Sequence, residues 1–110
     1  MTPEAGDPTT LAVAWGALGL VDSGLGEPRQ AISCYRQALA FARERKFPLT
    51  RAILVSLLAE FGDACRAAGD LPAAVEAWQQ ALQILGELGW PDMLGVGARL
   101  EQAGPPSPLG

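Results

Sequence analysis

The chain has 110 residues, of which 49% are hydrophobic and 18% are charged, and its formal net charge is −4. This length suits one domain with a small core, and the apolar content excludes a globally disordered chain. The acidic balance argues against a nucleic-acid-binding surface, which is usually basic. There is no histidine, so the commonest general base and metal ligand is missing.

Few residues could carry chemistry. The two cysteines, Cys34 and Cys65, form no CxxC pair, and such cysteines usually act as small buried apolar residues. The sequence contains no P-loop, no glycine-rich dinucleotide motif and no metal-ligand spacing. We therefore predict no catalytic residues, no metal and no other cofactor, and a protein that is not an enzyme.

The longest apolar run extends from Leu11 to Val21, about half of the roughly 20 residues that a membrane span needs. No basic segment precedes it, as one would in a signal peptide. The expectation is a cytoplasmic protein with neither a membrane nor a nucleic acid as partner.

Prolines and glycines divide the chain into five helical segments, because proline suits the first turn of a helix and glycine its end. The predicted helices are 9–24, 28–46, 50–68, 72–88 and 92–103. Thr50 is the expected N-cap of the third helix and Asp70 that of the fourth. Residues 1–7 are expected to be a flexible N-terminus, 8–103 a helical domain and 104–110 a disordered proline-rich tail. The prolines are Pro8, Pro28, Pro48, Pro72 and Pro91, and the terminating glycines are Gly24, Gly26, Gly69, Gly89 and Gly104.

Charged residues within these helices have ordinary structural interpretations. Arg43, Arg45 and Lys46 fall at the end of the second predicted helix, where cations favour the helix dipole. Glu60 and Asp63 share one face of the third predicted helix, and Arg66 follows at the same spacing. We interpret the two carboxylates as part of a solvated face rather than as an acid–base pair.

Two apolar stripes recur at helical spacing. The first predicts continuous helix between the two halves of the chain, and the second predicts a last helix that closes the end of the stack. Their members are Ile53, Leu54, Leu57, Leu58 and Phe61, and then Met93, Val96, Leu100 and Ala103.

The chain also repeats itself. Six residue pairs of the same kind are 43 positions apart, and one of them aligns an aromatic with an aromatic. The pairs are Gly19 and Gly62, Gly26 and Gly69, Ala31 and Ala74, Tyr35 and Trp78, Ala38 and Ala81, and Leu39 and Leu82. The pattern indicates a duplicated helical hairpin followed by one extra helix.

The duplicated pattern resembles the tetratricopeptide repeat (TPR) family over residues 12–88. The resemblance implies an all-α solenoid of two TPR-like antiparallel hairpins and a capping helix, which binds a protein or peptide partner. It assigns a repeat core of small residues at helix crossings and larger ones between helices. The core set is Trp15, Leu18, Gly19, Ala31, Tyr35, Ala38, Leu58, Phe61, Gly62, Ala74, Trp78 and Ala81.

The sequence departs from the family in its period of 43 instead of about 34 residues, and in Asp22, where an aromatic is usual. We expect the extra residues to lengthen the helices around Phe41–Leu54. Long units of this kind resemble the C-terminal sensor regions of bacterial antibiotic-regulatory and signal-transducing ATPase regulators. The segment from Ala81 to Asp92 and the later Ala98-Arg-Leu100 are similar to the way such regions finish.

The resemblance implies a partner-binding groove along the first helix of each hairpin. The predicted groove residues are Val13, Gly16, Ala17, Leu20, Ser56, Ala59, Glu60, Asp63 and Arg66. A clamp for a peptide carboxylate is not supported, because Gly16 and Leu20 stand where Lys and Asn would be needed. The apolar and acidic character suits a helix or a basic amphipathic segment.

A self-associating structural domain without another ligand remains the alternative. Helix 9–24 is apolar on every side, and one hairpin partner cannot cover it. We therefore expect a homodimer through that helix.

Overall fold

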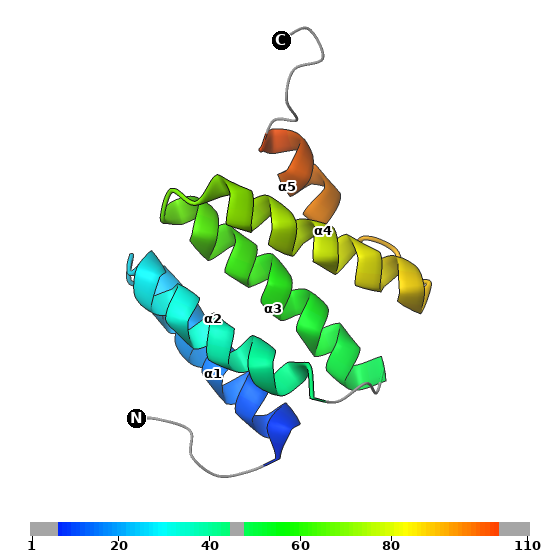
Figure 1. Ribbon diagram of the computed structural model, residues 1–110, viewed down its shortest axis with the longest axis horizontal. Helices are drawn as coiled ribbons and strands as arrows, with labels where there is room; N and C mark the ends of the chain where they lie inside the picture. The colour runs from blue at the N-terminus through cyan, green and yellow to red at the C-terminus, as the bar shows by residue number, and fades with distance from the viewer. Residues whose placement is uncertain (1–6, 45–47, 104–110) are drawn as a thin grey trace, which may run out of the picture.

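A computed structural model describes residues 7–44 and 48–103, and within these ranges the chain forms five α-helices and no strand. They are α1 (Pro8–Gly24), α2 (Pro28–Ala42), α3 (Pro48–Ala67), α4 (Leu71–Leu88) and α5 (Val96–Gln102). Helices α1 and α2 form one antiparallel hairpin and α3 and α4 a second, with α2 packed on α3 and α5 packed on α4 (Figure 1). The predicted all-α arrangement is confirmed.

The two hairpins turn in the same way. In each turn a glycine with positive φ donates to the carbonyl three residues back, and the next residue donates to the carbonyl five residues back. The first turn has Gly26 to Ser23 (3.1 Å) and Glu27 to Asp22 (2.9 Å), and the second has Gly69 to Arg66 (3.0 Å) and Asp70 to Cys65 (2.8 Å). These residues correspond at the offset of 43, so the repeat in sequence is also a repeat in geometry.

A glycine and an aromatic ring set the closest approach within each hairpin. A Cβ atom on Gly19 would lie 2.8 Å from Tyr35 Cε1, and one on Gly62 would lie 2.6 Å from Trp78 Cδ1. Tyr35 and Trp78 are almost fully buried, at 1% and 0% exposure. The indole Nε1 of Trp78 also donates to the carbonyl of Ala59 at 3.3 Å. Only glycine leaves room for these rings, because real Cβ contacts are longer than these distances.

The predicted repeat core is largely buried. Gly19, Gly62, Leu58 and the four core alanines are buried with the two rings, whereas Trp15, Leu18 and Phe61 are half-buried at its edge. The four alanines are Ala31, Ala38, Ala74 and Ala81. Cys65 is buried as expected, and Cys34 is half-buried with its thiol on Asp22 Oδ2 at 3.4 Å.

The predicted boundary between the hairpins was wrong at both ends. Helix α2 ends at Ala42 instead of residue 46, with Arg43 as its C-cap. Helix α3 begins at Pro48, so Thr50 is not its N-cap but a buried residue inside its first turn. The continuous helix predicted by the Ile53–Phe61 stripe is present in α3, although α2 is not lengthened.

The last helix also begins later than predicted. Residues 92–95 form a turn, Gly95 adopts a left-handed φ of 67°, and α5 starts only at Val96. Val96 is fully buried and Leu100 and Ala103 are half-buried, as the stripe predicted, but Met93 is 64% exposed. Asp92, four residues before the helix begins, caps it by accepting from the amides of Val96 and Gly97 at 2.8 Å each.

Several expectations concern other parts of the chain. Residues 1–6 of the predicted flexible N-terminus, the tail 104–110 with Gly104, and Arg45 and Lys46 lie outside the described residues. Asp7 is described and is the N-cap of α1, with its carboxylate accepting from the Thr10 amide at 2.8 Å. None of the five helices is long and apolar enough to cross a membrane.

Candidate protein-interaction surface

The first helices of the two hairpins enclose a hollow of about 260 Å³, here called the α1–α3 hollow. It contains six of the nine predicted groove residues, and Ile53 and Leu57 complete its lining. The six are Val13, Gly16, Ala17 and Leu20 from α1, and Ser56 and Glu60 from α3. The structure therefore brings six of the predicted residues, from two separate helices, together around one hollow.

The α1 side of this hollow is apolar and open. Val13 is 52% exposed and Leu20 is 57% exposed, and Ala17 between them is also exposed. Gly16 forms the buried floor, where a Cβ atom would lie 2.7 Å from Leu57 Cδ2. Apolar side chains exposed together beside a hollow are typical of a contact surface for another protein.

Glu60 is the one charged residue in the lining of this hollow. Burial raises the pKa of the Glu60 carboxyl, and the neighbouring Asp63 charge raises it further. Among the residues that the structure describes, no hydrogen bond or ion pair to the Glu60 side chain is formed. Its charge is therefore held at the edge of an apolar surface with no cation beside it.

The other three predicted groove residues have structural roles. Ala59 is buried and supplies the carbonyl that accepts from Trp78. Asp63 accepts from both Nε and Nη2 of Arg99, at 2.8 and 3.1 Å, and so ties α3 to α5. Arg66 forms no ion pair with Glu60 or Asp63, and its guanidinium lies 5.3 Å from the centre of the Trp78 ring.

A second, smaller hollow of about 100 Å³ adjoins the first, because Ser56 lines both. Its walls are Ala52, Val55 and Leu85, and the segment between α4 and α5 adds the exposed apolar residues Trp90, Met93 and Leu94. The apolar surface thus continues across α3 toward the C-terminal end of the chain.

Sequence reasoning placed Ile53 and Leu57 in the core stripe and missed their part in the hollow. The signal was available, since Ile53, Ser56, Leu57 and Glu60 follow the i, i+3, i+4, i+7 spacing of one helix face. The contribution of Trp90 and Leu94 had no such signal, because it depends on the turn before α5.

Within residues 7–44 and 48–103, no three His, Cys, Asp or Glu side chains come close enough to hold a metal ion. Burial and the bond to Asp22 raise the pKa of the Cys34 thiol, and burial raises that of Cys65. Neither thiol is thereby activated as a nucleophile.

No family model matches this chain, and no curated protein or solved structure matches it either.

Proposed function

We propose that this chain is a protein-interaction module of TPR type that binds a helical segment of a partner protein in the α1–α3 hollow. The observation that carries the proposal is the half-buried Glu60, which pairs with no described residue and lines the same hollow as the exposed Val13 and Leu20. Together they suit an amphipathic helix with apolar residues on one side and a lysine or arginine at its edge. The proposal includes no catalytic activity and no cofactor.

A cation from the partner would offset the desolvation cost of the half-buried Glu60 carboxylate in the free protein. A half-buried carboxylate loses part of its hydration, and a charge-assisted hydrogen bond from a lysine or arginine restores that stabilisation. Exposed apolar residues on α1 gain about 25 cal/mol for each Å² that the partner covers. The apolar contacts therefore supply affinity, and Glu60 selects for a basic partner.

Three further features support the proposed type of module and its cellular context. The duplicated hairpins suit the stacked architecture of repeat proteins that bind other proteins. Both cysteines are free thiols, which suits the reducing cytoplasm. The resemblance of residues 81–92 and 98–100 to the ends of regulator sensor regions supports a place in a regulator. An independent adaptor is the other form of the same proposal.

Self-association through α1 is the second candidate. It is favoured by the exposed apolar residues Val13, Leu20 and Val21, together with Leu25, which is 72% exposed just after the helix. A second copy of this surface would cover them in a two-fold dimer.

One set of variants tests both functions. Leu20→Glu puts a charge into the α1–α3 hollow, whereas Val21→Glu changes an equally exposed residue of α1 that does not line it. We expect wild type and Val21→Glu to capture the same partner from cell extract, and Leu20→Glu to lose it while remaining helical by circular dichroism.

Sedimentation at micromolar concentration separates the candidates. A monomer that captures a distinct partner supports the module, and a dimer that Leu20→Glu converts to monomer, with no other protein captured, supports self-association. Equal capture by Leu20→Glu and Val21→Glu would show that the hollow is not the binding surface.

A further inference from the structure

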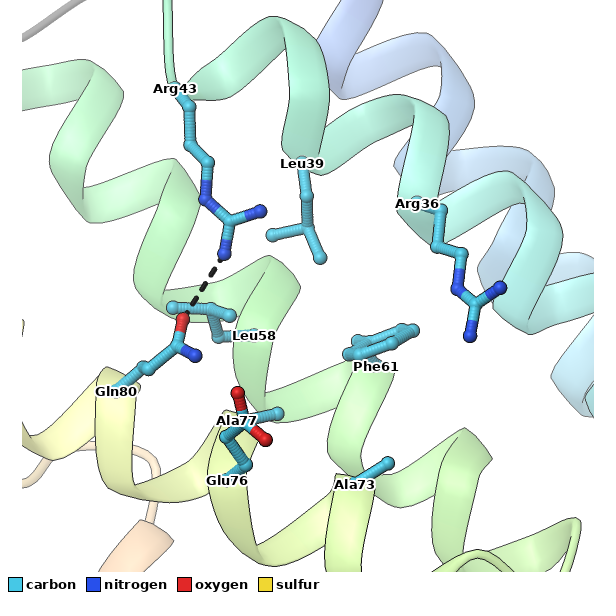
Figure 2. A pocket seen from close by; sticks show the side chains of 9 residues that line it. All are labelled: Arg36, Leu39, Arg43, Leu58, Phe61, Ala73, Glu76, Ala77 and Gln80. Atoms are coloured by element: carbon cyan, nitrogen blue, oxygen red, sulfur yellow. Dashed lines mark hydrogen bonds between the residues drawn. The ribbon is translucent and has the colours of Figure 1, made fainter.

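A further cleft lies on another set of helices. Helices α2, α3 and α4 enclose a cleft of about 270 Å³, here called the α2–α4 cleft, which shares no residue with the α1–α3 hollow. Figure 2 shows side chains of α2 and α4 facing one another across the α3 residues Leu58 and Phe61. The full lining is Arg36, Leu39, Arg43, Leu58, Phe61, Ala73, Glu76, Ala77 and Gln80.

The centre of this cleft is apolar and shallow. Phe61 is only half-buried, although the repeat pattern assigned it to the core. On the α4 side the lining includes the small side chains of Ala73 and Ala77. A large apolar side chain from outside could therefore rest on the Phe61 ring.

The α2 rim of the cleft carries two arginines that form no ion pair with any residue that the structure describes. Arg36 makes no hydrogen bond or ion pair with any residue that the structure describes, and Arg43 donates only to the neutral Gln80 Oε1, at 3.1 Å. The chain as a whole has a net charge of −4, so these two guanidinium groups form a local exception. Glu76 on the opposite, α4 rim is the one acidic residue in the lining.

The spacing of the two arginines defines what could pair with both. They are seven residues apart, with Arg36 inside α2 and Arg43 its C-cap in helical backbone conformation, hence about 10.5 Å along the helix axis. Two carboxylates seven residues apart on a second helix have the same spacing, and the residues three and four positions after the first carboxylate then lie between them on the same face.

We propose that the α2–α4 cleft docks an acidic amphipathic helix of a partner protein. Two acidic residues at i and i+7 pair with Arg36 and Arg43, and apolar residues at i+3 and i+4 rest on the half-buried Phe61. The charge preference is opposite to that of the α1–α3 hollow, where Glu60 favours a basic segment. The two surfaces can therefore bind different segments. The proposal for the α2–α4 cleft does not depend on the proposal for the α1–α3 hollow.

The test uses a synthetic helix-forming peptide with Glu at i and i+7 and Leu at i+3 and i+4. Two control peptides replace both Glu by Gln, or keep the composition but place the two Glu side by side. Binding to the full chain is followed by nuclear magnetic resonance of the backbone amides. The variants are Arg36→Gln and Arg43→Gln, with Arg29→Gln as the matched control, because Arg29 is an exposed arginine of α2 that does not line the cleft.

The expected result is a shift of the Phe61, Ala73 and Ala77 amides, with about three- to fivefold weaker binding for each of Arg36→Gln and Arg43→Gln. Arg29→Gln should bind as wild type does, and both control peptides should bind more weakly. Added salt should weaken the Glu peptide most.

Three outcomes would overturn the proposal: no binding of the Glu peptide at millimolar concentration, equal binding of either control peptide, or an equal loss for Arg29→Gln. Equal binding of the Gln peptide would mean that the cleft does not recognise the two charges. Equal binding of the peptide with adjacent Glu residues, or an equal loss for Arg29→Gln, would mean general charge attraction without a site. All three variants change exposed arginines, and unchanged circular dichroism excludes unfolding as the cause of any loss.

Discussion

At the scale of single residues, one glycine in each hairpin allows the close approach of an aromatic ring from the other helix. Gly19 faces Tyr35 and Gly62 faces Trp78, and both pairs occupy equivalent positions of the repeat. The larger indole of Trp78 lies closer, and its Nε1 is also fixed by the Ala59 carbonyl. The sequence repeat predicted these crossings because a small residue and a large one recurred together.

Gly62→Ala should therefore destabilise the fold by about 1–3 kcal/mol, because the new methyl group displaces a ring that has no room to move. Gly86→Ala is the matched control, since Gly86 lies inside α4 with nothing within 4 Å of its added Cβ. It should be neutral or stabilise by up to about 1 kcal/mol through helix propensity. Urea unfolding measures both, and a Gly62→Ala protein as stable as wild type would refute the close crossing.

The charge on Glu60 should lower the stability of the fold while favouring the binding of a basic partner. Its raised pKa means that the charged form is disfavoured in the folded protein, so the cost is present at pH 7 and disappears as the carboxyl is protonated. Glu60→Gln should raise the melting temperature at pH 7, and the difference from wild type should vanish below about pH 4.5, the ordinary value for this group. The same variant should weaken binding of a basic partner.

The control is Glu101→Gln, which removes the same charge from an exposed position of α5. A Glu60→Gln protein that melts at or below the wild-type temperature at pH 7 would contradict the burial of this charge.

At the scale of elements, local signals placed α1 and α4 to within one residue at each end, but misplaced the end of α2 and the starts of α3 and α5. Asp70 caps α4 by accepting from the Ala73 amide at 3.2 Å, and Gly89 ends that helix with φ of 71°, both as the sequence predicted. Pro91 and Asp92 looked like a similar start, but the left-handed Gly95 delays α5 to Val96. The pairing of Arg99 with Asp63 joins residues 36 positions apart, and local pattern carries no information about it.

Helix α5 should be the element that opens most easily. Seven residues are too few for a stable isolated helix, so its order depends on buried Val96, the Arg99–Asp63 pair and the Asp92 cap. Asp92→Ala removes the acceptor for two amides and should cost about 0.5–2 kcal/mol in this region. Amide exchange should accelerate in residues 96–102 and stay unchanged in α3.

Glu101→Ala, at an exposed position of the same helix, serves as the control. If Asp92→Ala left the exchange of the Val96 and Gly97 amides unchanged, the carboxylate would not be their cap.

At the scale of the whole molecule, the two proposed binding surfaces differ in the charge of their lining. Glu60 lies in the hollow between α1 and α3, and Arg36 and Arg43 line the cleft between α2 and α4. The first surface could be predicted, since six of its lining residues follow from the repeat register. The second could not, because it depends on how far α2 and α4 stand apart above Phe61.

The most direct measurement of the central claim is site-specific photo-crosslinking in cell extract. A photoreactive residue at Ala17, exposed in the α1–α3 hollow, is compared with one at Gln37, exposed on α2 and lining neither surface. We predict a discrete adduct with another protein from position 17 and none from position 37. The same adduct from position 37 and not from position 17, or adducts only between copies of this chain, would contradict binding of a partner in the α1–α3 hollow.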